Sequence, residues 1–183
     1  MNPAEKNLDK EKMMAVCDIV SRLPPSKLQE NIDTAVKLLP SKADDLKEKL
    51  DQPLTIGHDT KENRPFLQSE FNRDGTNSYR SPYSNEFFPH FEGTLPSMQM
   101  REFEKKANFL FDEYRKFYYP DGLVNAYCWD KDDGGFVTVV LVKKSAPSDR
   151  GLARGTWNSV NYVEINVDKN RRNAVYKVTT TVN

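Results

Sequence analysis

The sequence predicts an α+β fold, because apolar residues repeat at helical spacing in some parts and alternate with polar residues in others. Helical spacing is found in residues 1–53 and again in residues 97–120. Alternation is found in residues 121–183, and it indicates antiparallel strands. Residues 54–96 follow neither period. The expected order is a helical stalk, an irregular module rich in aromatic and turn-forming residues, one long helix and an antiparallel sheet.

The helical stalk is expected to contain three short helices. Prolines at positions 24, 25, 40 and 53 end three successive runs of helically spaced apolar residues. Connections this short make neighbouring helices antiparallel. Each apolar stripe is narrow, so these helices need a further surface to pack against.

The module is expected to be ordered although it shows little periodicity. A long irregular segment inside a compact domain is usually either functional or disordered. A disordered linker would not expose many aromatic rings to solvent. Residues 70–89 nevertheless carry five aromatic side chains, which are Phe71, Tyr79, Tyr83, Phe87 and Phe88.

Residues 97–120 give the most strongly amphipathic helical pattern in the chain, and its aromatic face is expected to lie in the core. Two hairpins are expected after this helix. The first pairs residues 123–130 with 136–144 across a glycine turn, and the second pairs 155–167 with 174–182. The sequence stops on the last of these strands, which is expected to leave a long, unprotected sheet edge.

Composition excludes several classes of protein. The 183 residues are 37% hydrophobic and 30% charged, with a formal net charge of zero. No apolar run approaches the roughly 20 residues that cross a bilayer, and the N-terminus lacks the apolar segment of a secretory signal. Cys17 and Cys128 lie on apolar faces and are expected to be buried thiols in a reducing compartment. A cytoplasmic protein is therefore expected.

The net charge of zero hides a basic C-terminal quarter. Residues 143–183 carry 8 basic and 3 acidic side chains, a net of +5, which favours an acidic partner. A basic sheet bearing Trp157, Tyr162 and Tyr176 would also suit the stacking of nucleic-acid bases. Against this, Trp157 and Tyr176 alternate with polar residues as core-facing strand residues do, and no ribonucleoprotein motif is present. A basic β-sheet module that binds nucleic acid is therefore kept as the alternative function.

Catalytic and metal-binding patterns are missing from the sequence. The polar run that begins at Glu70 has the start of a calcium-loop spacing, but Ser81 stands where a bidentate glutamate is required. Asp130, Asp132 and Asp133 precede a glycine pair and are expected to bond their own backbone as turn residues. There is no phosphate-binding loop and no nucleophile elbow. The chain is expected not to be an enzyme and to use no cofactor or metal.

Residues 69–74, Ser-Glu-Phe-Asn-Arg-Asp, resemble the Cys-Asp-Tyr-Asn-Arg-Asp signature of the beta subunits of F-actin capping protein. The likeness continues through Gly75 and residues 78–82, and further blocks match in the family's order from near residue 13 to residue 182. By these separated matches the chain is identified as a member of that family. The further blocks are Arg22–Pro25, Asp51–Leu54, Trp129-Asp130, Lys143-Lys144 and Tyr176–Thr179.

The resemblance implies a heterodimer that caps actin filaments. Family members pair an alpha and a beta subunit of similar fold, whose sheets join into one antiparallel sheet beneath long helices. The complex binds the barbed end of the filament and blocks gain and loss of subunits, without nucleotide or metal chemistry. The implied location is the cytoplasmic cytoskeleton. The implied partners are a capping protein alpha subunit, the filament end, regulators that carry stalk-binding peptides, and acidic phosphoinositides.

The resemblance also implies a groove for regulator peptides that wrap the stalk. The matching positions are Arg22, Asp51 and Phe87, and Phe87 stands where the family usually has tyrosine. Arg22 and Asp51 are equally explained as helix-end charges that complement a helix dipole or a cap.

The actin-contact candidates lie at the end of one strand and in the loop after it. The resemblance implies that a basic surface meets acidic actin, which speeds encounter and fixes orientation. A solvated loop without a partner is the other explanation for these side chains. They are Lys143, Lys144, Arg150 and Arg154.

The signature residues are expected to have a structural role. Short polar side chains would bond backbone, arginines would pair with carboxylates, and aromatic rings would fill the junction. The module would thereby brace the helical stalk against the sheet. The signature residues are Asn72, Arg73, Asp74, Tyr79 and Arg80, and Ser78 is expected to act with them.

Family beta subunits continue beyond the position of Asn183 with another strand, a long helix and a mobile C-terminal tentacle. The resemblance therefore covers the N-terminal two-thirds of a family member. A fragment, a short isoform and an incomplete gene model are the open explanations.

Overall fold

The computed structural model describes residues 11–17, 19–20, 28–43, 54–75, 77–146, 155–168 and 173–182. The chain divides into two compact units, Met1–Pro53 and Leu54–Asn183. Each unit is described by itself.

The first unit is helical at all of its described residues except Leu39. Residues 11–17 and 19–20 are helical, α2 spans Leu28–Leu38, and the short 3-10 helix η2 spans Pro40–Lys42. Pro40 occupies the first position of η2, where its missing N–H costs no hydrogen bond. The described part agrees with the first two predicted helices. The third, after Lys42, lies largely outside the described residues.

The second unit begins with two small sheets that the sequence analysis did not predict. β1 (Thr55–Asp59) and β2 (Arg64–Gln68) form an antiparallel hairpin. After the 3-10 helix η3 (Glu70–Asn72), a three-stranded sheet joins β3, β4 and β5. Strands of two to five residues are too short to show a period in sequence. The three strands are Arg73–Asp74, Ser78–Arg80 and Phe87–Phe88.

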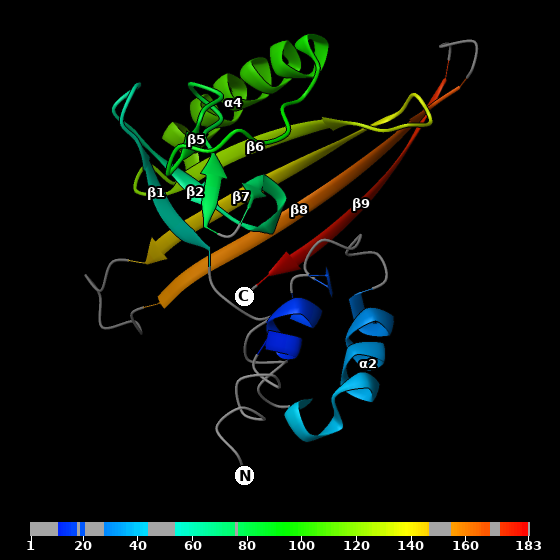
Figure 1. Cartoon of the computed structure of the whole chain (residues 1–183). Helices are drawn as coiled ribbons and strands as arrows, with labels where there is room; N and C mark the ends of the chain where they lie inside the picture. The colour runs from blue at the N-terminus through cyan, green and yellow to red at the C-terminus, as the bar shows by residue number, and fades with distance from the viewer. Residues whose placement is uncertain are drawn as a thin grey trace. The chain divides into compact units, whose positions relative to one another are not determined.

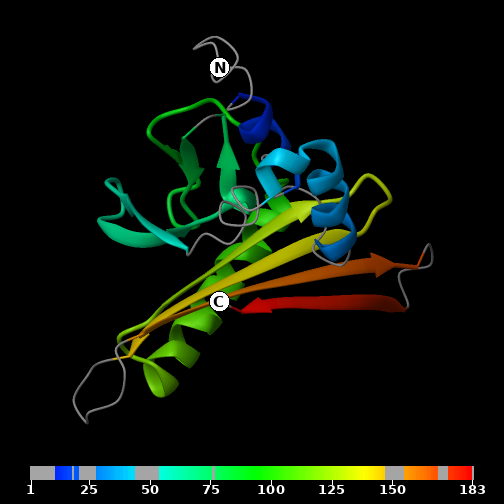
Figure 2. The same cartoon turned by 90° about the horizontal axis from the view of Figure 1, so that it is seen from below.

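The main sheet has four antiparallel strands in the order β6-β7-β8-β9 (Figures 1 and 2). They span Leu123–Asp130, Phe136–Ala146, Gly155–Val167 and Ala174–Val182. The two predicted hairpins are confirmed, and the registers continue without a bulge from Leu123↔Lys143 to Val167↔Ala174. With the helices, these strands confirm the α+β class.

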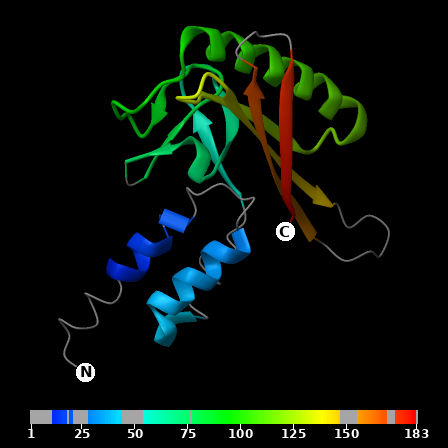
Figure 3. The same ribbon diagram turned by 90° about the vertical axis from the view of Figure 1, so that its right-hand side faces the viewer.

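Helix α4 (Met98–Tyr118) covers one face of the main sheet at its β6 side, and β9 forms the opposite edge (Figures 1 and 3). Under α4, the buried side chains of Val124, Ala126, Val140 and Val142 pack against Phe111 and its neighbours. The other face of β6 and β7 packs against the module. That second core consists of Leu54, Leu67, Tyr127, Val137, Val139 and Leu141.

The prediction that the aromatic face of α4 lies in the core is wrong for most of that face. Leu110 is 66% exposed, and other members of the same stripe are also exposed. The helix instead buries a largely polar stripe, which bonds main-chain groups and an arginine, and only Phe111 and Ala107 of its apolar face pack on the side chains of the sheet. The exposed stripe is Phe103, Leu110, Tyr114 and Phe117, and the buried residues are Met100, Arg101, Glu104 and Asn108.

The expectation that Trp157 and Tyr176 face a core is also wrong within this chain. Tyr176 is 71% exposed and Trp157 is 45% exposed. Val178 and Val182 of β9 are exposed as well. The alternation of apolar and polar residues is real, but α4 packs on β6 and β7 and leaves the same face of β8 and β9 uncovered by described residues.

Within the described part of the chain, no helix combines the length and the apolar character needed to cross a membrane.

The orientation of α4 on the sheet can be tested with two substitutions on its two faces. Replacing Phe111 by alanine removes an aromatic ring from the core under α4 and is expected to lower the free energy of unfolding by about 2 kcal/mol. The matched change Leu110→Ala removes an exposed side chain and is expected to change it by less than about 0.5 kcal/mol. Urea denaturation of both variants measures the difference, and equal losses would contradict the orientation of α4.

Candidate functional site: a buried ion network and an open sheet edge

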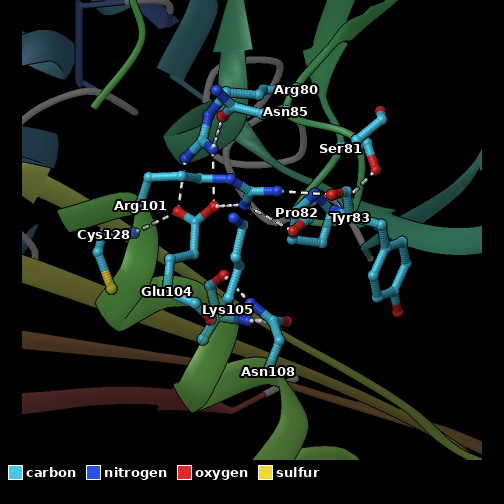
Figure 4. A network of polar contacts seen from close by, with 12 residues as sticks. Arg80, Ser81, Pro82, Tyr83, Asn85, Arg101, Glu104, Lys105, Asn108 and Cys128 are labelled. Carbon is cyan, nitrogen blue, oxygen red and sulfur yellow. Dashed lines mark hydrogen bonds and ion pairs between the residues drawn. The ribbon is translucent and has the colours of Figure 1, made fainter. Parts of the chain in front are cut away.

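The centre of the second unit is a buried ion pair between Arg80 of β4 and Glu104 of α4. Arg80 donates from Nη1 to Oε1 and from Nη2 to Oε2 of Glu104, both at 2.7 Å (Figure 4). Both side chains are 0% exposed. Two parallel bonds between a guanidinium and a carboxylate fix orientation as well as distance. This pair therefore sets how α4 lies against the module.

Arg101 extends the pair into a network of three elements. Its Nη1 donates to Glu104 Oε1 at 2.6 Å and to the Pro82 carbonyl at 2.7 Å, and its Nη2 donates to the Tyr83 carbonyl at 2.6 Å. Glu104 Oε2 also accepts the Cys128 amide of β6 at 2.8 Å. Figure 4 shows the Glu104 carboxylate between the two arginines, with Cys128 on its other side. The network thus joins the module, α4 and the main sheet.

Two buried guanidinium groups, those of Arg80 and Arg101, share the single carboxylate of Glu104. Taking unpaired charge out of water costs several kcal/mol, so the second positive charge needs other partners. Arg80 has two of these, since Nη1 also donates to Asn85 Oδ1 at 2.7 Å and Cζ lies 4.4 Å from the centroid of the Trp129 ring. The carbonyls bound by Arg101 supply the rest. The cation–π contact and these dipoles offset the excess charge.

The signature residues form hydrogen bonds and an ion pair inside the module. Asn72 donates to the carbonyls of Leu67 and Arg80 at 3.1 and 3.0 Å, and its Oδ1 accepts the Ser69 amide at 2.8 Å. The Asp74 carboxylate accepts the Gly75 and Thr94 amides, both at 2.8 Å. Ser78 donates to the Pro89 carbonyl, and Arg73 pairs with Glu70 at 2.6 Å.

Aromatic rings fill the module and its contact with the main sheet. The rings of Phe71 and Tyr162 have centroids 5.8 Å apart, which carries the module onto β8. Trp129 donates through Nε1 to the Phe71 carbonyl at 3.2 Å. Tyr79 is half-buried in the same region. These contacts bind the module to the sheet; the predicted bracing of the stalk stays a prediction.

Asp59 organises the turn side of the module. Burial by itself would raise the pKa of this carboxyl, but hydrogen bonds from the Ser81 hydroxyl, the Glu62 amide and Ser84 outweigh it and lower the pKa to about 2. The Lys61 amide donates to the same carboxylate at 2.9 Å. Asp59 therefore stays ionised and holds the segment around Ser81 against the β1–β2 hairpin.

The two edges of the main sheet differ. At the β6 edge, Asn108 of α4 donates to the Ala126 carbonyl at 2.7 Å and accepts the Ala126 amide at 3.0 Å. Together with the bond from Cys128 to Glu104, these contacts put side chains where a neighbouring strand would bind. At the β9 edge, the described residues place no element beyond the strand.

The structure separates the predicted actin-contact residues. Lys143 is bonded inside the fold, to the Leu54 carbonyl at 2.8 Å and to Asn158 Oδ1 at 3.0 Å. Lys144 is exposed beside its register partner Trp157. The other two candidates, Arg150 and Arg154, lie outside the described residues.

Of the three regulator-groove candidates, only Phe87 lies among the described residues. Arg22 and Asp51 lie outside the described residues. Phe87 is buried, with its ring 6.1 Å from that of Phe91 in an edge-on contact. Its role in a groove stays a prediction, whereas its packing inside the module is observed.

The structure agrees only in part with the expectations for the turn aspartates and for the two cysteines. Asp133 bonds the Gly135 amide as a turn residue, but Asp130 instead accepts from the amide and hydroxyl of Ser97, the N-cap of α4. Asp130 thus ties the start of α4 to the end of β6. Cys128 is buried as expected, and burial raises its pKa to about 11, while Cys17 is only half-buried.

The sequence analysis missed Arg101, Glu104 and Asn108. Their spacing of three and four residues places them on one helical face, so a polar stripe was visible in the pattern. The pattern did not predict that this stripe is buried, because a polar stripe on a helix usually faces solvent. Among the described residues, no cluster of three or more His, Cys, Asp or Glu side chains could hold a metal ion.

Comparison with known proteins places this architecture in a family. The family described as "F-actin capping protein, beta subunit" matches residues 13–183. The chain is 39% identical over 170 residues to an F-actin-capping protein subunit beta of Drosophila melanogaster, covering 92% of this chain and 60% of the relative. It is 40% identical over 176 residues to one of Dictyostelium discoideum, covering 94% and 64%. The chain belongs to the F-actin capping protein beta-subunit family.

A third relative shows the same proportions. The subunit beta of Aspergillus fumigatus is 38% identical over 182 residues, which cover 99% of this chain and 55% of that protein. The chain therefore spans less than two thirds of the length of these relatives. The match runs through both units of the chain.

The ion network predicts a large loss for one substitution. Glu104→Gln leaves two buried guanidiniums without a counter-charge and is expected to lower the free energy of unfolding by about 3–5 kcal/mol. Glu102→Gln is the matched control, because Glu102 makes an exposed pair with Lys105 at the same helical spacing, and it should leave stability nearly unchanged. Chemical denaturation measures both. Similar effects of the two variants would contradict a central role for Glu104.

The lowered pKa of Asp59 predicts that the stability of the fold falls in acid. Its folded pKa of about 2 lies below the ordinary value of 3.8, so its stabilisation is complete above pH 3.8 and is lost as the pH falls through about 2. Asp59→Asn is expected to lower the free energy of unfolding by about 2 kcal/mol at neutral pH. The gap between wild type and variant should close between these pH values. A gap that stays constant with pH would refute the assignment.

Proposed function

We propose that the chain is the beta-type subunit of a heterodimer that caps the barbed ends of actin filaments. The observation that carries the proposal is the family match over residues 13–183. Relatives named F-actin-capping protein subunit beta support it at 38–40% identity. Capping is binding without a chemical reaction, which fits a chain whose signature polar residues bond the main chain and each other inside the fold. The proposed location is the cytoplasmic actin cytoskeleton.

The proposed partner is a capping protein alpha subunit, which would cover the apolar face of β8 and β9. Strand β9 has an unpaired edge among the described residues, and its Tyr176, Val178 and Val182 expose apolar surface on the α4 side of the sheet. Exposed apolar residues on an open strand favour strand addition by a partner. The exposed stripe of α4 borders the same side. A second subunit would cover both.

Actin contact is proposed to be electrostatic in its first step. The basic C-terminal quarter, a net of +5, would steer the complex toward acidic surfaces. Lys144 is the described side chain best placed for this, because it is exposed, whereas Lys143 is engaged within the fold. Arg150 and Arg154 are proposed to act with Lys144. Acidic phosphoinositides would compete for the same charges.

Regulation is proposed to act through the helical stalk, residues 1–53. Peptides that wrap this stalk would contact Arg22 and Asp51, with Phe87 shaping the adjoining module. We propose a separate task for each part of the chain. The stalk serves regulation and the module over 54–96 braces it. The helix over 97–120 covers the sheet, and the sheet over 121–183 pairs with the partner.

Seeded actin elongation tests the proposal. The chain is co-expressed with a capping protein alpha subunit, the complex is purified, and growth from filament seeds is followed. Barbed-end growth is expected to stop, and Lys144→Glu should weaken the effect while leaving the complex intact. Glu102→Lys, which adds positive charge on α4 away from this strand, is the control. A purified complex that leaves barbed-end growth unchanged would contradict the proposal.

A further inference from the structure

A cleft of about 260 Å³ opens between the module and α4. Its helix residues lie at positions 105, 108, 109 and 112, on a different face of α4 from the exposed stripe of Phe103 to Phe117. Ligand pockets usually span roughly 300–1,000 Å³, so a cleft of this size is suited to a single large side chain. The lining includes Glu62, Arg64, Tyr83, Lys105, Phe109 and Asp112.

Tyr83 forms a fixed wall of this cleft. Its hydroxyl accepts from Asn125 Nδ2 at 3.0 Å, and its carbonyl accepts from Arg101 Nη2 at 2.6 Å. The guanidinium of Arg64 lies over the Tyr83 ring, with Cζ 4.0 Å from the ring centroid. A surface that is already in position before a ligand arrives loses less conformational freedom on binding.

Arg64 has binding capacity that the fold does not use. Its Nη2 lies 3.8 Å from Asp112 Oδ2, which is too long for a hydrogen bond. Asp112 is bonded more closely to Arg115, at 3.0 Å, and to Lys116, at 3.5 Å. Among the described residues, the Arg64 side chain forms no other polar contact, and it is 48% exposed. Because a guanidinium is planar and only one of its faces stacks on Tyr83, the other face can take a second aromatic ring.

The charges that line the cleft cancel. Arg64 and Lys105 are basic, and Glu62 and Asp112 are acidic. A charged ligand therefore gains little net attraction, whereas an uncharged ring can stack on the guanidinium without a charge penalty. Phe109 adds apolar surface, because it lines the same cleft and is 66% exposed. The cleft is thus complementary to a large, neutral aromatic side chain.

We propose that the cleft binds a tryptophan side chain of a partner protein, with the indole stacked on the free face of Arg64 and against Phe109. Tryptophan offers cations the most favourable aromatic face. A buried indole N–H needs an acceptor, and the Glu62 carboxylate lines the cleft for this role. None of the undescribed residues of this sequence is aromatic, so none of them supplies the ring. Its own two tryptophans lie in β6 and β8 of the main sheet.

The first test is NMR of the full 183-residue chain, isotope-labelled and titrated with N-acetyl-tryptophanamide. The signals of Arg64, Tyr83 and Phe109 are expected to shift and to saturate. N-acetyl-leucinamide, which is apolar but has no ring, is the matched compound and is expected to give no saturable shift there. Equal binding of the two compounds at these residues, or binding of neither, would overturn the inference.

Two pairs of variants locate the binding. Arg64→Met removes the charge and is expected to weaken tryptophanamide binding about threefold or more. Lys116→Met is its control, because Lys116 pairs with Asp112 but does not line the cleft. Phe109→Ala should also weaken binding, whereas Leu110→Ala, which removes an equally exposed neighbour outside the cleft, should not. Equal affinities of wild type, Arg64→Met and Phe109→Ala would overturn the inference.

Selection from a random peptide library tests the chemistry of the partner. Peptides are selected on the wild-type chain and depleted on Arg64→Met, which removes those that bind elsewhere on the surface. The remaining peptides are expected to be enriched in tryptophan. Enrichment in acidic residues without aromatic ones would overturn the inference. None of these measurements involves actin or an alpha subunit, so a failed elongation assay would leave this inference standing.

Discussion

The buried contact of Glu104 with Arg80 and Arg101 is the interaction on which the rest of the second unit depends. It is the point where the module, α4 and β6 meet, and each contributes a group that the other two leave unsatisfied. Removing any one partner would strand a charge or an amide away from water, at a cost larger than most apolar contacts here provide. An ion network of this kind gives a defined position to a helix whose apolar stripe faces elsewhere. That position in turn determines which sheet surfaces stay exposed.

The exposed surfaces form a consistent set. α4 covers β6 and β7, and its Asn108 bonds the β6 edge, while the described residues leave the same face of β8 and β9 uncovered. The apolar side chains of β9 and the stripe from Phe103 to Phe117 lie on that side of the sheet. An apolar face that the described residues leave uncovered is a candidate interaction surface. Membership of the capping protein beta-subunit family agrees with this reading.

Sequence alone predicted the parts whose period is long and regular. The four strands of the main sheet and α4 were placed within a few residues, since eight to twenty-one residues show a clear pattern. The short strands β1 to β5 were missed because two to five residues are too few to show a period in sequence. The polar face of α4 was misjudged for the same reason: Arg80 lies 24 positions away from Glu104 in sequence. The bonds of Asn72 and Asp74 were foreseen, because short polar side chains in turns bond nearby backbone.

A double-mutant cycle between Arg80 and Glu104 tests the central interaction most directly. Arg80→Met, Glu104→Gln and the combined variant are compared with wild type by urea denaturation. The losses of the single variants should exceed that of the combined variant when summed, with a coupling of about 2 kcal/mol or more. Additive losses, with a coupling near zero, would show that the two side chains contribute independently and would contradict the account.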